Sequence, residues 1–338
     1  MQNWGTIPVS HAIMKLRMPL VLTVVANPSD ASLKPLEKLP KDIQLTISEK
    51  PDVLERAVPE SDAIAIGIFS AAVWPNAVKL AKKARWFHSL GTGVDKLLTP
   101  ETIAHPATLT NGRGVFARPL GDWTVAAMLH FAWDIPRVMR QQREGRWEPF
   151  TCPGIEGKSL GIVGFGSIGR AAAERAKPFG VKILALRRRG KLSENDPLMD
   201  QSFQPDQIKD LMAASDYVLA ATPLTPETRG MIGASEIAAM KPTGVFINVG
   251  RGQTVDEAAL VRALETGAIR GAALDVVQRE PLPYPHPLYT LPNVLLSPHT
   301  ADHTEGFLGP AVQCFIENVE RFRKGEPLEN VVDKHAGY

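Results

Sequence analysis

The sequence predicts a two-domain α/β protein with parallel sheets, and three observations lead to this prediction. The chain has 338 residues, whereas a single hydrophobic core seldom grows past roughly 250 residues. Short apolar runs alternate with stretches of helical period, which is typical of βαβ units and a parallel sheet. Hydrophobic residues make up 44% and charged residues 22% of the chain, values close to those of ordinary globular proteins.

Four apolar runs near the start predict strands, and two stretches between them predict helices. The strands are expected at residues 20–25, 43–47, 63–68 and 86–89, and the helices at 51–58 and 75–84. This alternation predicts a first, smaller α/β domain of the flavodoxin-like class. A turn-rich stretch at 110–114 ends it and precedes a helical run at 120–133.

The alternation becomes more regular after Ser159. Strands are expected at residues 160–163, 181–186, 217–221, 244–249, 271–274 and 294–296, and helices at 167–179 and 256–266. Each helix is followed directly by a glycine, the usual residue just past a helix end. These elements predict a second domain built on a Rossmann-type, doubly wound parallel sheet.

A last helix is expected at residues 306–324, because its apolar side chains recur at the spacing of one buried face. Those side chains are Phe307, Ala311, Cys314, Phe315, Val319 and Phe322. We expect this helix to return to the first domain. The predicted division is therefore a discontinuous first domain, residues 1–115 and 303–338, and a second domain at residues 116–302.

The first residues of the chain allow more than one interpretation. Residues 1–17 show no clear period, so we expect a loose extension, or translation that begins at Met14 or Met18. Lys15 and Arg17 precede an apolar run at 18–26, which imitates a secretory signal but also suits a first buried strand. The run is short, which favours the strand. No segment is long enough to span a bilayer.

Charge and cysteine content narrow the function classes. The 38 basic and 36 acidic side chains give a formal net charge of +2, so no global field favours nucleic acid or a membrane surface. Cys152 and Cys314 form no CxxC or Cys/His cluster, so neither a disulfide framework nor a metal site is indicated. A reducing, cytoplasmic compartment is expected.

Three glycines, Gly164, Gly166 and Gly169, follow an apolar strand and open a helix. This is the context of a dinucleotide-binding loop. Gly164 is expected to make the tight turn, Gly166 to let backbone amides approach a pyrophosphate, and Gly169 to let helix and strand pack closely. A glycine turn used only for packing is the alternative. The context favours a dinucleotide bound by the second domain.

The next strand ends without the acidic residue that is typical of NAD-selective sites. Leu186 is followed by Arg187, Arg188 and Arg189, and the first acidic side chain after them is Glu194. Guanidinium groups suit a 2′-phosphate by charge and by fork geometry. The sequence therefore predicts NADP(H) as the preferred cofactor, with NAD(H) as the second choice. A solvated basic loop is the alternative.

Arg251, Glu280 and His299 each follow a predicted strand, where open α/β sheets place their ligands. Taken singly, a histidine or a glutamate is more often structural than functional. Spacing alone does not bring the three together.

Several motifs in order resemble the D-isomer-specific 2-hydroxyacid dehydrogenase family, from about Leu20 to the final helix. They are GTGVD at 91–95, GKSLGIVG at 157–164, TPLTPET at 222–228, NVGRG at 248–252, LDV at 274–276 followed by Glu280, and SPHT at 297–300. The arginine run, and the end of the chain soon after its last helix, point to the glyoxylate and hydroxypyruvate reductase group.

The resemblance implies that Arg251 binds a 2-oxo acid, that His299 is the acid–base residue and that Glu280 pairs with this histidine. Histidine titrates nearest neutral pH, so it can protonate the alkoxide left by hydride transfer. A carboxylate beside it raises its pKa. The first domain becomes the substrate domain, in which the amides of Thr92 and Gly93 are expected to hold the substrate carboxylate. Catalysis then requires domain closure.

The resemblance also implies cofactor contacts. These are the amides of Phe165, Gly166, Ser167 and Ile168, the side chains of Thr222 and Thr228, and Asp275 at the nicotinamide amide. Both threonines would serve equally well as caps of turns. Asp275 would serve equally well to stabilise its loop.

The expected activity is NADP-preferring reduction of a small 2-oxo acid, such as glyoxylate or hydroxypyruvate, to the D-2-hydroxy acid. Alternatives are a phosphoglycerate or phosphite dehydrogenase on the same scaffold, or a non-metabolic NAD(P)-sensing binding protein. The resemblance further suggests a homodimer, with the long helix after residue 115 in its interface.

Overall fold

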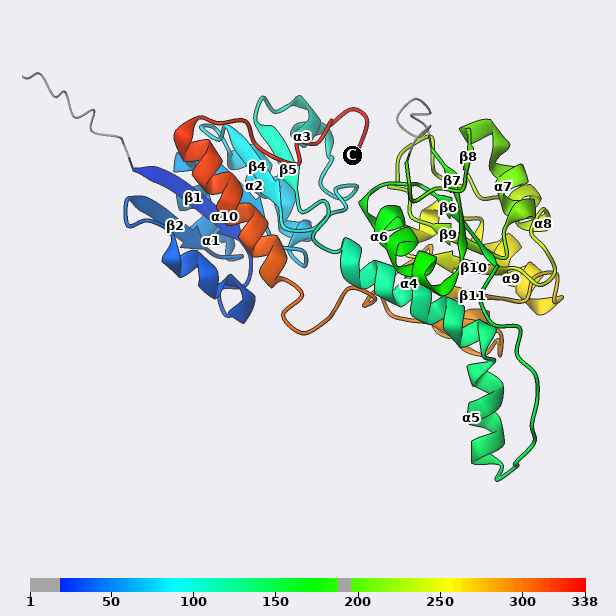
Figure 1. Cartoon of the computed structure of the whole chain (residues 1–338). Helices are drawn as coiled ribbons and strands as arrows, with labels where there is room; N and C mark the ends of the chain where they lie inside the picture. The colour runs from blue at the N-terminus through cyan, green and yellow to red at the C-terminus, as the bar shows by residue number, and fades with distance from the viewer. Residues whose placement is uncertain (1–18, 188–195) are drawn as a thin grey trace, which may run out of the picture.

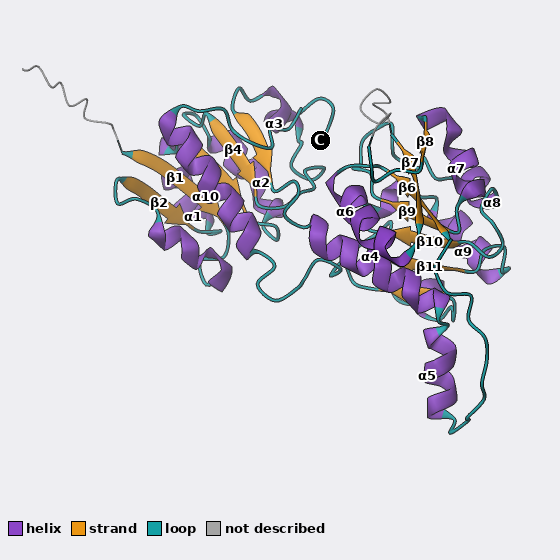
Figure 2. Cartoon of the chain, viewed as in Figure 1, coloured by secondary structure: helices purple, strands orange, loops and turns teal. Residues whose placement is uncertain are grey.

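The computed structural model describes residues 19–187 and 196–338, which form two lobes around two parallel sheets (Figure 1). Helices lie on the faces of both sheets (Figure 2). The predicted fold class, a Rossmann-type sheet with a smaller α/β domain, is confirmed. Within the described ranges, no helix combines the length and the apolar character that a membrane span requires.

The first sheet has five parallel strands in the order β2-β1-β3-β4-β5. They are β1 Leu20–Val25, β2 Ile43–Ile47, β3 Ala63–Ile66, β4 Trp86–Ser89 and β5 Thr108–Asn111. This is the flavodoxin-like order, in which β1 lies between β2 and β3 and the connections change direction. The sequence did not predict β5, because its last residues belong to a stretch rich in turn formers.

The helices of the first lobe are short, and α10 joins them from the end of the chain. They are α1 Pro51–Ala57, α2 Trp74–Leu80, α3 Pro100–Ala104 and α10 Gly309–Lys324. The ring of Phe315 in α10 packs on Trp86 of β4, with ring centroids 5.3 Å apart, and Figure 1 shows α10 lying across the first sheet. The expected return of the last helix therefore occurs. It begins three residues later than predicted, and Cys314 is only half-buried.

Two elements of the first lobe end earlier than the sequence predicted. Strand β3 ends at Ile66 instead of residue 68, because Gly67 begins a turn in which its carbonyl accepts from the Ser70 amide. Helix α2 ends at Leu80 instead of residue 84, because Ala81 leaves the helical region with a ψ of 67°.

The second sheet has seven parallel strands in the order β12-β11-β10-β9-β6-β7-β8. They are β6 Ser159–Val163, β7 Lys182–Leu186, β8 Gln201–Phe203, β9 Tyr217–Ala220, β10 Val245–Asn248, β11 Gly271–Leu274 and β12 Val294–Leu296. The connections change direction on either side of β6, so the carboxyl end of β6 is where a ligand is expected. Edge strand β8 was not predicted from the sequence.

Six α-helices accompany this sheet within the described ranges. They are α4 Ala117–Ala132, α5 Ile135–Arg143, α6 Ser167–Ala176, α7 Ile208–Ala214, α8 Ala234–Ala238 and α9 Glu257–Glu265. Helix α4 packs closely on α6, since a Cβ at Gly121 would lie 2.8 Å from the backbone of Ala171. Helix α5, absent from the sequence prediction, projects away from both lobes (Figure 2).

Candidate active site

The glycine loop has the geometry that a dinucleotide requires. Gly164, directly after β6, has a φ of +100°, which side-chain-bearing residues rarely adopt. A Cβ at Gly169 would lie 2.6 Å from the carbonyl oxygen of Gly164, so only glycine lets α6 pack this close to the strand. A Cβ at Gly166 would meet nothing within 4 Å. The backbone is therefore open to a ligand at the middle glycine only.

The first turn of α6 offers free amides at this opening. Gly166 is the N-cap of α6, and no side chain caps the helix. Its early N–H groups, at Ser167 and Ile168, point out of the helix end and favour an anion. Phe165 is buried, with the Arg170 guanidinium 5.6 Å from its ring centre. The loop is thus fixed by packing, whereas its amides remain available.

The arginine run is only partly described. Arg187 directly follows β7, and its Nη1 lies 4.0 Å from a carboxylate oxygen of the partly buried Asp196, which also pairs with Arg170. Burial by itself raises the pKa of Asp196, but the Leu198 amide and both guanidinium groups outweigh it and lower the pKa. Arg188 and Arg189 lie outside the described residues. The sequence argument overlooked Asp196, which stands two residues after Glu194.

The two threonines expected at the cofactor differ in their partners. Thr222 is buried, with its hydroxyl 3.9 Å from the sulfur of Met231. The Thr228 hydroxyl donates to the Pro223 carbonyl at 2.7 Å and accepts from the Thr225 amide at 2.8 Å. In this structure the Thr228 hydroxyl therefore makes the contacts of a turn cap, which was the alternative role.

His299 and Glu280 form a hydrogen-bonded pair at the carboxyl edge of the second sheet. His299 follows β12 with a φ of +56°, and its Nδ1 lies 2.8 Å from a Glu280 carboxylate oxygen. This hydrogen bond is the main reason that the pKa of His299 is raised, and it outweighs burial. Burial raises the pKa of Glu280, but the hydrogen bond and charge of His299 lower it overall. The pair therefore favours an imidazolium beside a carboxylate.

Asp275 holds the loop that carries His299. One oxygen of this buried carboxylate accepts from the Ser297 hydroxyl at 2.7 Å and from the amides of Thr300 and Ala301 at 2.8 and 3.0 Å. The His299 amide donates to the Asp275 carbonyl at 2.9 Å. Within the described residues, the second carboxylate oxygen has no hydrogen-bond partner. Asp275 thus stabilises its loop, as the alternative interpretation expected, and retains an acceptor.

Arg251 follows β10 and contacts the first lobe. Its Nε donates to a carboxylate oxygen of Asp95 at 3.0 Å, and its Nη1 donates to the Gly250 carbonyl at 2.8 Å. A Cβ at Gly93 would lie 1.5 Å from Arg251 Nη2, so the guanidinium lies directly on the glycine. Sequence reasoning missed Asp95, although it ends the GTGVD motif, because its partner is 156 residues away.

The loop at Thr92 and Gly93 is held by its own contacts. The Thr92 hydroxyl donates to the Gly112 carbonyl at 2.9 Å, and the Thr92 carbonyl accepts from the Asn111 side chain at 2.7 Å. Across the described ranges, neither the Thr92 amide nor the Gly93 amide has an acceptor. The Arg251 guanidinium therefore lies on a glycine whose own amide, like that of Thr92 directly before it, is a free donor, an arrangement that suits a carboxylate.

Comparison with known proteins identifies the family of the chain. The family model described as D-isomer specific 2-hydroxyacid dehydrogenase, NAD binding domain, matches residues 125–301. The chain belongs to this family. The family and its members identify the chain as an NAD(P)-dependent oxidoreductase.

Individual relatives cover most of the chain. A glyoxylate reductase of Korarchaeum cryptofilum is 33% identical over 84% of this chain and 86% of its own length. A D-3-phosphoglycerate dehydrogenase of Methanocaldococcus jannaschii is 31% identical over 93% of this chain, which spans 60% of that protein. A D-isomer specific 2-hydroxyacid dehydrogenase of Xanthobacter autotrophicus, solved with NADPH and MES, superposes with a TM-score of 0.80 at 28% identity, over 95% and 100% of the two chains.

For this dehydrogenase-family chain, the structure divides most of the expected site residues, together with Asp95, into two groups. One group lies within the second lobe and comprises the glycine loop, Asp275, and the pair of Glu280 and His299. The other spans both lobes and comprises Arg251, Asp95 and the loop at Thr92 and Gly93. The residues present fit a dinucleotide, because the middle glycine and the uncapped helix end leave room and donors for its phosphates.

Proposed function

We propose that this chain reduces a small 2-oxo acid to the D-2-hydroxy acid, with NADPH as its preferred hydride donor. The observation that carries the proposal is the His299–Glu280 pair at the same sheet edge as Arg251. When bound, the reduced nicotinamide supplies a hydride to the carbonyl carbon. The Nε2 proton of the His299 imidazolium then neutralises the alkoxide oxygen, and Glu280 stabilises the imidazolium before this transfer.

Arg251 and the first-lobe loop are assigned to the substrate carboxylate. Nη2 of Arg251 lies directly on Gly93, and the Thr92 and Gly93 amides have no acceptor within the described residues, so we assign the three groups to one anion. Because these groups come from both lobes, closing the lobes completes the anion site and excludes water. We accordingly propose that residues 1–115 and 303–338 form the substrate domain and residues 116–302 the dinucleotide-binding domain.

On the cofactor side, the amides of Phe165, Gly166, Ser167 and Ile168 are assigned to the pyrophosphate. The free oxygen of Asp275 suits the amide NH₂ group of the nicotinamide, because an ionised carboxylate can only accept hydrogen bonds. Thr222 and Thr228 stay predicted neighbours of the phosphates or ribose.

Arg187 supports the NADPH preference. It directly follows β7, at the strand end where NAD-selective sites carry an acidic residue. The decisive quantity is kcat/KM with NADPH divided by kcat/KM with NADH. We expect a ratio above one, and a decrease of about tenfold in Arg187→Ala, the effect of one charge-assisted hydrogen bond. Lys182→Ala is the control, because it removes a positive charge from the opposite end of the same strand. A wild-type ratio of one or below would overturn the preference.

The substrate is proposed to be glyoxylate or hydroxypyruvate, and the glyoxylate reductase relative supports this choice. The phosphoglycerate dehydrogenase relative keeps 3-phosphohydroxypyruvate as the second candidate. The test is NADPH oxidation with glyoxylate, hydroxypyruvate, pyruvate, phenylpyruvate and 3-phosphohydroxypyruvate, together with NADP⁺ reduction by phosphite. Highest kcat/KM with one of the first two supports the proposal. NADPH binding without turnover of any substrate would favour a sensing protein instead.

We further propose a cytoplasmic homodimer. The projecting arm that begins with α5 exposes large apolar side chains, including Val138, Met139 and Trp147, of which Trp147 is 96% exposed. Large apolar side chains exposed together on one projecting arm are typical of a protein interface. Light scattering tests the proposal, with twice the chain mass of 36.8 kDa expected. A monomer at micromolar concentration would contradict it.

A further inference from the structure

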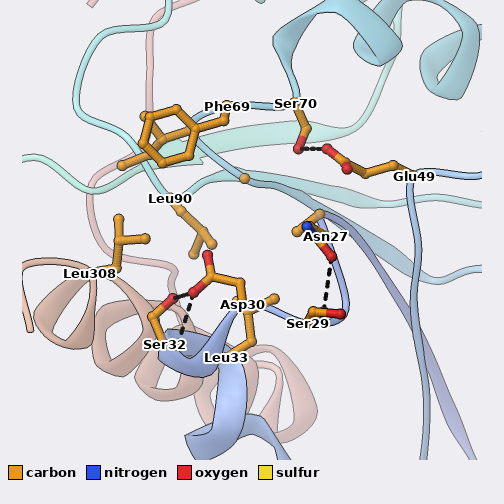
Figure 3. A pocket seen from close by; sticks show the side chains of 13 residues that line it. Asn27, Ser29, Asp30, Ser32, Leu33, Glu49, Phe69, Ser70, Leu90 and Leu308 are labelled. Atoms are coloured by element: carbon orange, nitrogen blue, oxygen red, sulfur yellow. Dashed lines mark hydrogen bonds between the residues drawn. The ribbon is translucent and has the colours of Figure 1, made fainter.

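The segment after α10, residues 325–338, takes no part in the chemistry proposed above and is called the tail. The first lobe also has a cavity of about 470 Å³, which Figure 3 shows bordered by Phe69, Leu90 and Leu308. The described lining of this cavity comes from segments after β1, β2, β3 and β4 and from Leu308, and it includes no residue of the tail. The tail instead contacts β5 and the second lobe.

The tail pairs with β5, the last strand of the first sheet. The Val332 amide donates to the Leu109 carbonyl at 2.8 Å, and the Asn330 carbonyl accepts from the Asn111 amide at 3.2 Å. The Val332 side chain is buried in the apolar core of this lobe. The tail therefore belongs to the first lobe and covers a sheet edge that would otherwise expose unpaired backbone groups.

Lys334 fixes the tail a second time. Its Nζ donates to the carbonyls of Thr102 and Ala107, each at 3.2 Å, and to the carbonyl of His105. An ammonium group has three donors, so all of them are used. The residues after Lys334 therefore start from a point that is held firmly on the first lobe.

Asp333 folds the last residues into a closed turn. One of its carboxylate oxygens accepts from the amides of His335 and Ala336, each at 2.9 Å. Its carbonyl accepts from the Gly337 amide at 2.8 Å, and its own amide donates to the main-chain oxygen of Tyr338 at 3.0 Å. Gly337 has a φ of +84°, a conformation that favours glycine. The turn thus gives Gly337 a defined position.

Gly337 lies at the junction of the two lobes. A Cβ there would lie 3.3 Å from Thr225 Cγ2 of the second lobe and 3.9 Å from Leu98 Cδ1 of the first. Figure 1 agrees, because it shows the end of the chain between the two lobes. The tail, anchored on one lobe, therefore touches the other through a residue without a side chain.

Thr225 belongs to the turn at residues 222–228, which is proposed above to face the dinucleotide. Its side chain is buried. Its amide donates to the Thr228 hydroxyl at 2.8 Å, and its carbonyl accepts from the Arg229 amide at 3.0 Å. A contact on Thr225 therefore restricts the whole turn.

We propose that the tail is a positioning segment for the cofactor, which holds the turn at residues 222–228 against the first lobe through Gly337 and so slows the release of NADP(H). The inference rests on the proposed function, because that function assigns this turn to the dinucleotide. Since Val332 and Lys334 keep the tail on the first lobe, opening the lobes breaks the contact between Gly337 and Thr225.

The first test is hydrogen exchange, without cofactor, of the full chain and of a chain that ends at Ala336. The shorter chain lacks Gly337 but keeps the anchors at Val332 and Lys334. We expect the bonded amides of Thr225 and Arg229 to exchange at least about fivefold faster in it, the lower end of typical coupling between sites. Exchange in β9 and β10 should stay the same.

The second test is the rate constant of NADPH dissociation, measured by stopped-flow displacement. The shorter chain and Gly337→Leu should each raise it at least about fivefold, with little change in the association rate constant. Gly325→Leu is the matched control, because Gly325 lies in the same tail with a φ of +73° but a Cβ there would meet nothing within 4 Å. Both leucines strain the backbone, and only the one at 337 meets Thr225. The control should release NADPH at the wild-type rate.

Unchanged exchange at Thr225 in the shorter chain would overturn the proposal. So would equal NADPH dissociation rate constants in Gly337→Leu and Gly325→Leu. A wild-type chain that binds no dinucleotide would contradict the proposed function instead, and the exchange measurement distinguishes the two failures because it needs no cofactor.

Discussion

The His299–Glu280 pair and the Arg251–Gly93 contact are built in different ways. His299, Glu280 and the supporting Asp275 all lie within the second lobe, joined by hydrogen bonds of 2.7 to 3.0 Å. Arg251, in contrast, meets Asp95 and Gly93 across the junction of the two lobes. The proposed acid is therefore assembled regardless of how the lobes are placed. The proposed anion site depends on their closure.

This difference predicts that damage to the two regions affects different kinetic constants. A change in the His299 region should lower kcat and leave substrate affinity nearly intact. A change at the junction should act mainly on KM, because it removes a group that binds substrate in the ground state as well as in the transition state.

The largest effect is expected for His299→Ala. A positioned general acid contributes about 10²- to 10⁴-fold, so kcat for 2-oxo acid reduction should fall by that factor, while the Kd of NADPH, from fluorescence quenching, stays unchanged. His286→Ala is the control, since it breaks another histidine–glutamate pair of the second lobe, 3.7 Å from Glu257. The control should stay within about twofold of the wild type. A loss below threefold in His299→Ala would refute the assignment.

Gly93→Ala is expected to have the next largest effect. Its Cβ would lie 1.5 Å from Arg251 Nη2, so the guanidinium must move, and displacement of a binding group by about 1 Å costs about 10²-fold. The loss should be seen in kcat/KM for the oxo acid. Gly91→Ala is the matched control, because its Cβ would meet only ordinary contacts at 3.5 Å and beyond. Equal activity of both variants would show that the junction does not form the anion site.

Asp95→Asn should have a smaller effect. The Arg251–Asp95 ion pair is partly exposed, with side-chain exposures of 26% and 19%, and such pairs are worth little. The asparagine oxygen can still accept from Arg251. We expect kcat/KM for the oxo acid to fall roughly fivefold through KM, a change of about 1 kcal/mol. A decrease in kcat alone would place Asp95 with the acid–base residues instead.

Local features of the site were predictable from the sequence, whereas distant contacts were not. The glycine loop was predicted because strand, turn and helix adjoin along the chain, and glycine at 164 permits the φ of +100° that the turn has. The pairing of His299 with Glu280 followed from a family resemblance. Asp95 was missed as the partner of Arg251, since only tertiary folding brings them together. For Asp275 the sequence offered two roles, a contact to the nicotinamide amide and stabilisation of its own loop, and did not decide between them.

In the fold, strand β8 and helix α5 are two of the elements that the sequence did not predict. Strand β8 has three residues, of which only Phe203 is buried. Helix α5 has a single buried side chain, Gln141, so it gives no buried apolar stripe. A local signal was nevertheless present, because Asp134 caps the helix and Pro136 stands in its first turn. The contact of the tail with the second lobe depends on the arrangement of the two lobes, which local sequence does not specify.

The pH dependence of reduction tests the central claim, that Glu280 maintains His299 as the acid, most directly. The pKa of His299 is raised by Glu280, so the imidazolium persists below this raised pKa, and reductase kcat should fall as pH rises through it. In Glu280→Gln the same fall should occur at lower pH, about tenfold for each pH unit above the new pKa. An identical pH profile in wild type and Glu280→Gln would contradict the account.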